Sequence, residues 1–347
     1  MPRWRSAVTP IFGVGGVQGL DGEEHARRKG LLLSLMTAEQ VGELADRSEE
    51  EWRGAAHKWR GGDVQLYAAA QEVLTRAVCR WAGTPLEEPE VAARTRDLTS
   101  LFDAAGSVRR HFEARRARRR SERWAEEWIV KLRVNRLSAG ESVAARIALY
   151  VEPNGRRLPP RVAAVELLNV LRPTVAVSVY VVFLAHALHA HPEMREKLEA
   201  APPGEIECFV EEVRRLYPFF PAVPARVRED FEWQGFRLRA GTRTLFDLYG
   251  TNHDPRIWER PDTFLPDRFR EARDILFGFV PQGGGDPASG HRCAGEWITV
   301  SLMQRALRFL VDEIDYSVPE QDLHIDFGRL PALPASRFVL SEARPRR

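Results

Sequence analysis

Apolar residues recur at helical spacing through the first two thirds of the chain, which predicts a series of amphipathic or buried helices. These helices are expected over Leu31–Leu44, Val64–Trp81, Arg120–Leu137 and Val162–His189. From Tyr217 onward, frequent prolines divide the chain into shorter pieces. Strands are expected over Phe231–Arg237 and Thr242–Leu248, followed by a last amphipathic helix over about Gly295–Glu313.

This alternation predicts a mainly α fold with a small β part. No internal repeat and no low-complexity linker divides the 347 residues. We therefore expect one domain over residues 1–347.

One predicted helix is apolar on almost every face, which is typical of a helix in the middle of a large core. Pro159 and Pro160 suit its start, and His191–Pro192 marks its end. Inside it, Pro173 removes a backbone donor and is expected to kink the helix about one turn upstream.

The residue before that proline, Arg172, puts a charged guanidinium where a core favours leucine. Glu166 lies about 240° round the helix and is poorly placed to pair with it. Arg172 either reaches outward or meets an acid from another helix, or it forms a socket for a carboxylate that its planar fork can bind.

Composition and net charge limit the classes of partner that the protein is expected to bind. The net charge is +2, which indicates no polyanionic partner. Eight arginines fall within Arg109–Arg123, but no aromatic residues interleave with them as in a nucleic-acid site, so a solvated helix face is expected. The longest apolar stretch, Pro173–Ala185, is too short for a membrane span, and no secretory signal is visible. Three widely spaced cysteines suit a reducing, cytoplasmic location.

A glycine-rich segment with the sequence PQGGGDPASGHRCAGEW, residues 281–297, contains a single cysteine, Cys293. His291 and Arg292 precede it and a predicted helix follows, and this environment is expected to lower the thiol pKa. A thiolate serves as a nucleophile or as a metal ligand. No known local signature of a cysteine nucleophile is present. A single axial ligand of haem iron fits the pattern better, and an inert loop cysteine is the alternative.

Two further patterns belong to the same half of the chain. Glu212 and Arg215 lie at i and i+3 on one predicted helix face. Further on, Arg268 within PDRF is expected to close a three-way network with them. The order of these motifs before a cysteine loop is far more specific than any one of them.

With these motifs the sequence resembles the haem-thiolate cytochromes, the cytochrome P-450 superfamily, and more closely its bacterial fatty-acid peroxygenase branch. The resemblance runs from about Phe12 to Ser341 and is carried by FGVGGVQGLDGEEHARRK, LLNVLRPTVAVS, FVEEVRRLYPF, LFDLYGTNHDPRIWERPDTFLPDRF and the cysteine loop. It implies a cytochrome P-450-like fold that binds haem b. Cys293 would be the axial ligand, and His25, Lys29 and His291 would contact the haem propionates.

The departures from ordinary members also match that branch. Arg172-Pro173 stands where others carry an acid–alcohol pair, and the cysteine loop is longer and lacks an upstream aromatic residue. Relatives carry several dozen residues before Phe12. The chain is therefore expected to be N-terminally incomplete, lacking the first strands and an early helix of that fold.

The resemblance implies a reaction between hydrogen peroxide and a long-chain fatty acid, with no obligatory reductase. The substrate carboxylate would pair with Arg172, act as the acid–base group and direct hydroxylation to Cα or Cβ. Phe12 and Val17 would line the pocket near the carboxylate, unless they are ordinary loop packing. Gln18 favours hydroxylation, because a histidine at this position accompanies decarboxylation. The alternatives are a decarboxylase that makes terminal alkenes, a reductase-dependent haem monooxygenase, and a non-functional truncated fragment.

Overall fold

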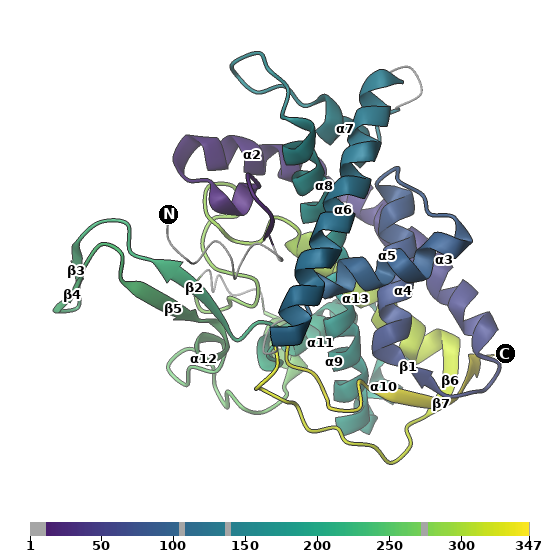
Figure 1. Cartoon of the computed structure of the whole chain (residues 1–347). Coiled ribbons are helices and arrows are strands. Elements are labelled where there is room, and N and C mark those ends of the chain that lie inside the picture. Colours follow the sequence, from purple (N-terminus) through teal and green to yellow (C-terminus); the bar gives the residue numbers. More distant parts are fainter. Residues whose placement is uncertain (1–11, 104–107, 136–139, 272–276, 347) are drawn as a thin grey trace.

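The long apolar segment around residue 172 lies in the middle of the molecule in the computed structural model of the chain, which describes residues 12–103, 108–135, 140–271 and 277–346. Helices form most of the body (Figure 1). The first of these are η1 (Val17–Gly19), α2 (Gly22–Ser34), α3 (Ala38–Trp59), α4 (Leu66–Trp81), α5 (Glu88–Ser100), α6 (Val108–Val134) and α7 (Val143–Leu149). They are followed by α8 (Pro160–Ala176), α9 (Ser178–Ala190), α10 (Pro192–Leu198), α11 (Pro203–Leu216), α12 (Leu248–Asn252), η3 (Pro266–Phe269), α13 (Glu296–Arg308) and the π-turn η4 (Phe309–Glu313).

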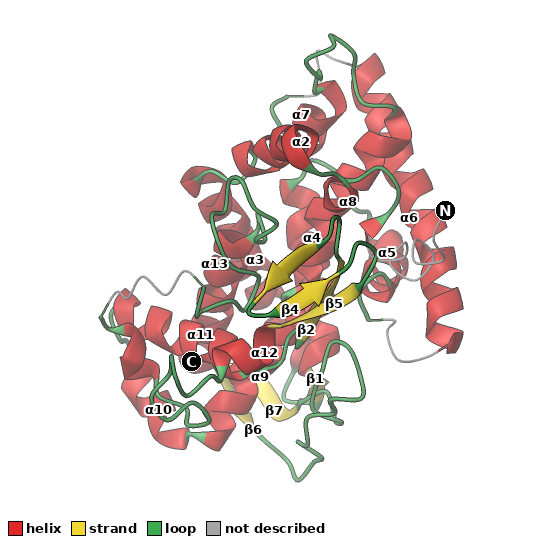
Figure 2. Cartoon of the chain, turned by 90° about the vertical axis from the view of Figure 1, so that its left-hand side faces the viewer, coloured by secondary structure: helices red, strands yellow, loops and turns green. Residues whose placement is uncertain are grey.

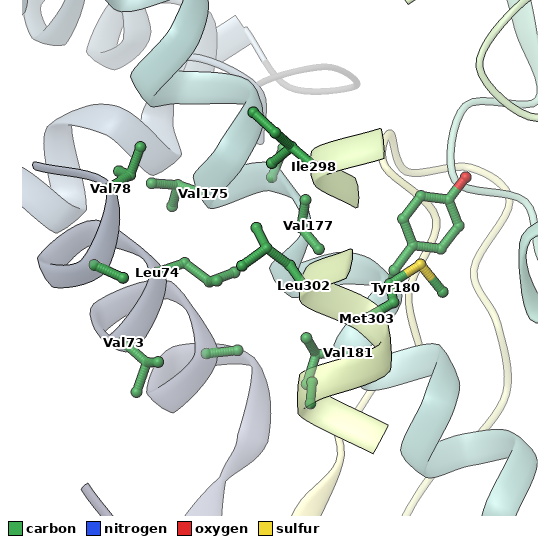
Figure 3. Packing of buried hydrophobic residues seen from close by; sticks show 14 of the residues in the cluster. Val73, Leu74, Val78, Val175, Val177, Tyr180, Val181, Ile298, Leu302 and Met303 are labelled. Atoms are coloured by element: carbon green, nitrogen blue, oxygen red, sulfur yellow. The ribbon is translucent and has the colours of Figure 1, made fainter. Parts of the chain in front are cut away.

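The core is built around α8 and α9. Helix α8 packs against α4, α5, α6 and α7, whereas α9 packs against α4, α11 and α13. Figure 3 shows the contact region, where Val175, Val177 and Leu302 from α8, the α8–α9 junction and α13 come together. Within the described residues, Pro160–Ala190 is the one helical run long and apolar enough to cross a membrane, and 94% of its most apolar window is buried in the protein. It is a core helix, as its all-round apolar pattern predicts.

The interruption of this helix falls at Val177, which is one turn after Pro173 and not one turn before it. Upstream of Pro173, where the kink is predicted, α8 is continuous from Pro160. The Thr174 hydroxyl donates to the carbonyl of Val170 at 2.9 Å and supports the turn that the proline weakens. The N–H of Val177 then donates to Thr174 O at 3.2 Å, closing a tighter turn between the two helices.

The β structure lies in two places on opposite sides of the helical body (Figure 1). On one side, β1 (Val64–Gln65), β7 (Val339–Pro345) and β6 (Ile314–Ser317) form an antiparallel sheet in that order. On the other side, β2 (Ala222–Arg226) pairs with β5 (Arg243–Asp247), and β3 (Phe231–Trp233) pairs with β4 (Phe236–Leu238). We call these four strands the β arm, and Figure 2 shows β2, β4 and β5 on the face turned to the viewer.

The predicted mainly α fold with a small β part is confirmed, but two further predicted elements are divided in the structure. Leu31–Leu44 is not one helix, because Thr37 caps a new helix by accepting a hydrogen bond from the N–H of Gln40. Phe231–Arg237 is not one strand, because Gln234 and Gly235 both have positive φ and turn the chain into a hairpin. The strand predicted over Thr242–Leu248 is present as β5.

The arginine-rich stretch predicted as a solvated helix face lies in α6. Arg109 fits that description, since its side chain is 88% exposed and pairs with Glu113 at 3.0 Å. Arg118 does not, because it is buried and bonds to Glu122 at 2.8 Å.

Candidate active site

Cys293 is held by the glycine-rich loop before α13 and by a lysine from α2. The N–H of Cys293 donates to the carbonyl of Gln282 at 3.0 Å, which folds the loop back on itself. Gly283 allows this approach, because its φ is +97° and a Cβ there would lie 3.2 Å from Arg292 Cα. The buried Lys29 ammonium donates to the carbonyls of Gly290 and, at 2.7 Å, of Arg292. The loop is therefore fixed from both sides.

The pKa of the Cys293 thiol differs from the one expected from the sequence, because it is raised and not lowered. Burial raises the pKa of Cys293, although hydrogen bonds from the Gly295 N–H and the Gln282 side chain, together with the charge of Arg214, act in the opposite direction. The expected lowering by the flanking basic residues is wrong, because Arg292 turns to Glu296 at 2.6 Å. The raised pKa favours the neutral thiol in the polypeptide alone, and a cation bound to the sulfur would favour the thiolate.

Glu296 itself is part of a buried cluster behind the cysteine that was not found from the sequence. Arg214 bonds to Glu296, to Glu211 at 2.5 Å and to the Gln282 side chain at 3.0 Å. These residues come from α11, α13 and the cysteine loop. The only signal for this cluster in the sequence is the pair of adjacent arginines, Arg214 and Arg215. From the sequence we predict a role for Arg215 alone.

Two histidines and the lysine lie together on the α2 side of the loop. The rings of His25 and His291 are 4.0 Å apart and tilted by 35°. Burial, His291 and Lys29 lower the pKa of His25. His291 is 60% exposed and stands 3.9 Å from Asp21. The arrangement brings together His25, Lys29 and His291 as predicted from the sequence, and it suits anionic groups.

Arg172 is buried in α8, with 5% of its surface exposed. Within the described part of the chain it forms no hydrogen bond or ion pair, and its Nη1 atom is buried without a partner. Its guanidinium lies over the ring of Phe12, 5.2 Å from the centroid. Burial lowers the pKa of Arg172 to about 9, with a smaller contribution from Arg118. Within the described residues, neither exposure to solvent nor an acidic residue from another helix compensates the charge of Arg172. A buried unpaired cation of this kind costs several kcal/mol.

Glu166, the acid on the same helix, is engaged elsewhere. Its carboxylate accepts from Arg28 of α2 at 2.8 Å and from Asn169 at 3.0 Å. Arg28 also bonds to Glu152 at 2.8 Å. This buried cluster joins α2 to α8 and was missed from the sequence, although the unusual Glu166 in an apolar helix was a signal for it.

The segment before α2 lies against α8 close to Arg172. At Gly16, a Cβ atom would stand 2.7 Å from Val165 and 2.8 Å from Asn169, so only glycine fits this contact. Val17 is buried beside it, whereas Gln18 in η1 is exposed. Phe12, Val17 and Arg172 are therefore carried by neighbouring elements, with Pro173 next to Arg172 in α8.

The electrostatics indicate that these elements converge on the cysteine. The charge of Cys293 acts on the pKa of Lys29 in α2, of Arg172 in α8 and of Tyr180 in α9. The cysteine loop, α8 and α2 therefore lie within electrostatic range of one another.

Glu212 lies in a buried network behind this region. Its carboxylate pairs with Arg215 through two contacts of 2.8 Å and with Arg268 at 3.2 Å. Arg215 also donates to backbone carbonyls of Asn252 and Pro261, at 2.9 and 2.7 Å. These backbone carbonyl partners could not be predicted, because no pattern of side chains in the sequence marks them. The network ties α11 to the loop before η3 and to η3 itself.

Comparisons with known proteins give a consistent picture. A family model described as cytochrome P450 matches residues 206–336. Cytochrome P450 71D180 of Origanum vulgare is 31% identical over 163 residues, which is 43% of this chain and 32% of that protein. Cytochrome P450 71D94 of Mentha gracilis is 36% identical over 115 residues, or 32% of this chain and 22% of that protein. The matches span about a third or less of these curated relatives.

Solved structures match over the whole chain. Cytochrome P450SP alpha (CYP152B1) in complex with (R)-ibuprophen has a TM-score of 0.94 and 48% identity, covering 99% of this chain and 84% of that chain. Cytochrome P450EX alpha (CYP152N1) with myristic acid has a TM-score of 0.93 and 43% identity, covering 100% and 84%. A variant of cytochrome P450 OleT in complex with arachidonic acid has a TM-score of 0.94 and 32% identity, covering 99% and 83%. The resemblance predicted from the sequence motifs is confirmed.

Proposed function

We propose that this chain, which belongs to the cytochrome P450 family and is closely related to its CYP152 members, uses hydrogen peroxide to hydroxylate long-chain fatty acids at Cα or Cβ. The observation that carries the proposal is the buried, unpaired guanidinium of Arg172 in the core helix α8.

Haem b fits the residues present. Among the described residues, no group of three or more His, Cys, Asp or Glu could hold a metal ion, so iron would have to bring its other ligands with it. Cys293 offers a single sulfur whose pKa burial raises, and a directly bound cation would keep it deprotonated. His25, Lys29 and His291 would hold the two propionates. When bound, haem b supplies the oxygen-transfer chemistry, and a thiolate ligand favours cleavage of the O–O bond.

Arg172 would bind the substrate through its carboxylate. A fatty-acid carboxylate satisfies the buried guanidinium with two parallel hydrogen bonds and removes the cost of an unpaired charge. Solved structures of related proteins are complexes with myristic acid and arachidonic acid, which supports this substrate class for this chain.

The pair formed by Arg172 and the carboxylate would also move the proton that peroxide chemistry requires. Pro173 follows Arg172, so neither residue offers the acid–base group. The substrate carboxylate accepts the proton and returns it, while Arg172 keeps that carboxylate in place. Because the carboxylate is fixed, the first carbons of the chain are the ones brought to the reacting centre, which favours Cα and Cβ.

Phe12, Val17 and Gln18 would shape the carboxylate end of this pocket. Phe12 lies against the Arg172 guanidinium and screens it from solvent. Gln18 does not titrate, so it gives no proton to the bound acid, and this favours hydroxylation over decarboxylation to terminal alkenes.

We also propose which partners the protein has and where it acts. The substrates are a fatty acid and hydrogen peroxide, with no obligatory reductase, no nucleic acid and no membrane span. The protein would act in the cytoplasm as one haem-thiolate domain over residues 1–347, with Glu212, Arg215 and Arg268 locking the core behind the cysteine.

The test is to incubate haem-loaded protein with myristate and hydrogen peroxide and to analyse the products by mass spectrometry. The α- and β-hydroxy acids are expected, formed without any reductase. A parallel reaction contains a ferredoxin–reductase system, NADPH and catalase. Product in this second reaction alone would establish a reductase-dependent monooxygenase. Absence of the red-shifted Soret band in the reduced carbon monoxide complex would instead identify a non-functional fragment.

A further inference from the structure

A row of aromatic side chains leads from the cysteine region through the core. The ring of Tyr180 in α9 stacks on Phe219, with centroids 4.6 Å apart, and meets Phe183 edge-on at 6.4 Å. Phe183 in turn stacks on Tyr217 at 4.8 Å. Tyr180 lies in α9, which packs against α13, the helix that directly follows the cysteine loop. From Tyr180 through Phe183 to Tyr217, successive ring centroids lie 6.4 and 4.8 Å apart, and closely spaced rings of this kind let an electron pass between them.

The far end of this row is a tyrosine bonded to a histidine. The Tyr217 hydroxyl and His186 Nδ1 are 2.8 Å apart. With the proton of the neutral ring on Nε2, the Nδ1 atom carries the lone pair and accepts the Tyr217 O–H. Burial lowers the pKa of His186, so its ring is neutral at neutral pH and able to accept a proton.

Tyr180, at the near end, has no such acceptor. It is fully buried, and its hydroxyl has no hydrogen-bond partner in the described part of the chain. In Figure 3 its hydroxyl points away from Val177 and Leu302. An oxidised tyrosine is a much stronger acid than a neutral one and must lose its proton to become a lasting radical. Tyr180 can therefore relay an electron, but only Tyr217 can settle as a neutral radical.

We propose that Tyr217 and His186 form a one-electron oxidation site that draws oxidising equivalents away from the haem when peroxide reacts in the absence of a fatty acid. This inference rests on the proposed peroxide-dependent function. One electron leaves the Tyr217 phenol and passes through Phe183 and Tyr180 to the oxidised haem, which is reduced by one electron. The phenol O–H bond breaks, and its proton goes to His186 Nδ1. A thiol reductant in solution later returns one electron to Tyr217, and the histidine returns the proton.

The first experiment mixes haem-loaded protein with hydrogen peroxide, without fatty acid, and records electron paramagnetic resonance spectra of freeze-quenched samples. A tyrosyl signal is expected, and Tyr217→Phe should reduce it several-fold while it bleaches its haem faster. Tyr249→Phe is the matched control, because Tyr249 also lies against a histidine, His253, at 4.0 Å, but that histidine bonds the Tyr249 backbone carbonyl. An undiminished signal in Tyr217→Phe would overturn the proposal.

A second measurement does not depend on peroxide chemistry. The one-electron oxidant hexachloroiridate(IV) is added to wild type, Tyr217→Phe and His186→Gln. The signal should form in wild type and fall several-fold in both variants, because glutamine keeps a polar group but does not take up the proton. A signal in His186→Gln equal to that of wild type would mean that the pair is structural only, and the proposal would fail.

Conversion of myristate by the same preparations separates this proposal from the proposed function. Tyr217→Phe should hydroxylate myristate at the initial rate of wild type, since no step of the proposed hydroxylation uses Tyr217. Product formation without any tyrosyl signal in wild type overturns the oxidation site alone. If no product forms in wild type, the peroxygenase function fails, and the hexachloroiridate measurement then decides on Tyr217.

Discussion

The guanidinium of Arg172 lies over the ring of Phe12, 5.2 Å from its centroid, and its Nη1 atom has no hydrogen-bond partner within the described residues. A cation–π contact in a desolvated setting contributes about 2 kcal/mol, which is less than the cost of burying the charge. The site therefore holds a cation whose full compensation has to come from a bound anion.

Arg172→Ala should lose both substrate anchoring and the acid–base pair. Removing one partner of a buried ion pair costs about 3–5 kcal/mol, or about two to four decades in the step that it supports. Lysine should rescue poorly, because a point charge does not reproduce the fork. The measurement is peroxide-driven turnover of myristate at equal haem content. Arg161→Ala, an exposed position on the same helix, is the control. Equal rates for wild type and Arg172→Ala would exclude the proposed mechanism.

Cys293→Ala should abolish the red-shifted Soret band of the reduced carbon monoxide complex, because that band requires a thiolate on the iron. Cys208→Ala is the matched control, since that cysteine is buried in α11 and lies outside the cysteine loop. The spectrum of the reduced complex, recorded for both variants, checks the assignment. A surviving band in Cys293→Ala would show that another group is the ligand.

Gln18→His should raise the fraction of terminal alkene among the products, since histidine brings a titratable group to the carboxylate end of the pocket. Gln18→Ala should stay with hydroxy acids, because it also lacks a titratable group. Gas chromatography of the products from fully haem-loaded protein gives the ratio. An unchanged ratio in the histidine variant would remove the proposed role of position 18.

Glu212→Gln should destabilise the protein strongly, because Arg215 and Arg268 would lose their shared counter-charge in a buried site. The expected loss is about 3–5 kcal/mol in the free energy of unfolding, measured by urea denaturation. Glu113→Gln breaks an exposed pair with Arg109 and should cost less than about 1 kcal/mol. Similar losses for both substitutions would contradict the structural role of the network.

His186 should make stability depend on pH. Burial lowers its folded-state pKa below the ordinary value of 6.5, so the unfolded chain binds this proton more readily. Its contribution is therefore complete above about pH 6.5 and is lost as the pH falls toward the folded pKa. Urea unfolding between pH 5 and 8 should show a smaller slope for His186→Gln than for wild type. An identical slope would mean that His186 protonates equally in both states.

The helical body could be predicted from its apolar spacing. Arg172 and Cys293 could be predicted from the sequence for a reason that they share. An arginine inside an apolar helix and a cysteine in a glycine-rich loop both violate local rules, and such violations are visible without a structure. The helix division at Thr37 escaped prediction because the apolar spacing continues across it. The turn at Gln234-Gly235 was missed because one strand and a tight hairpin have similar composition.

The raised pKa of Cys293 was not predictable, because it depends on contacts between distant parts of the chain. Arg292 is beside the cysteine in sequence, but Glu296 takes its charge, and Arg214 arrives from a helix some eighty residues earlier. The same applies to the Arg28–Glu166 pair, whose members are 138 positions apart. The charge of a side chain can be read from the sequence, whereas the residue that neutralises it is determined by the fold.

The β arm has a consequence for handling the protein. Among the described residues, β2 and β5 pair only with each other, so each strand has an open edge, and Leu245 and Phe246 are 68% and 60% exposed. Open edges with apolar side chains act as templates for other strands and promote self-association at high concentration. Pro224 interrupts the hydrogen-bonding groups of β2, and Arg226 and Arg243 place charge at one end of the pair. Replacing Leu245 with lysine should therefore extend the concentration range over which the protein stays monodisperse.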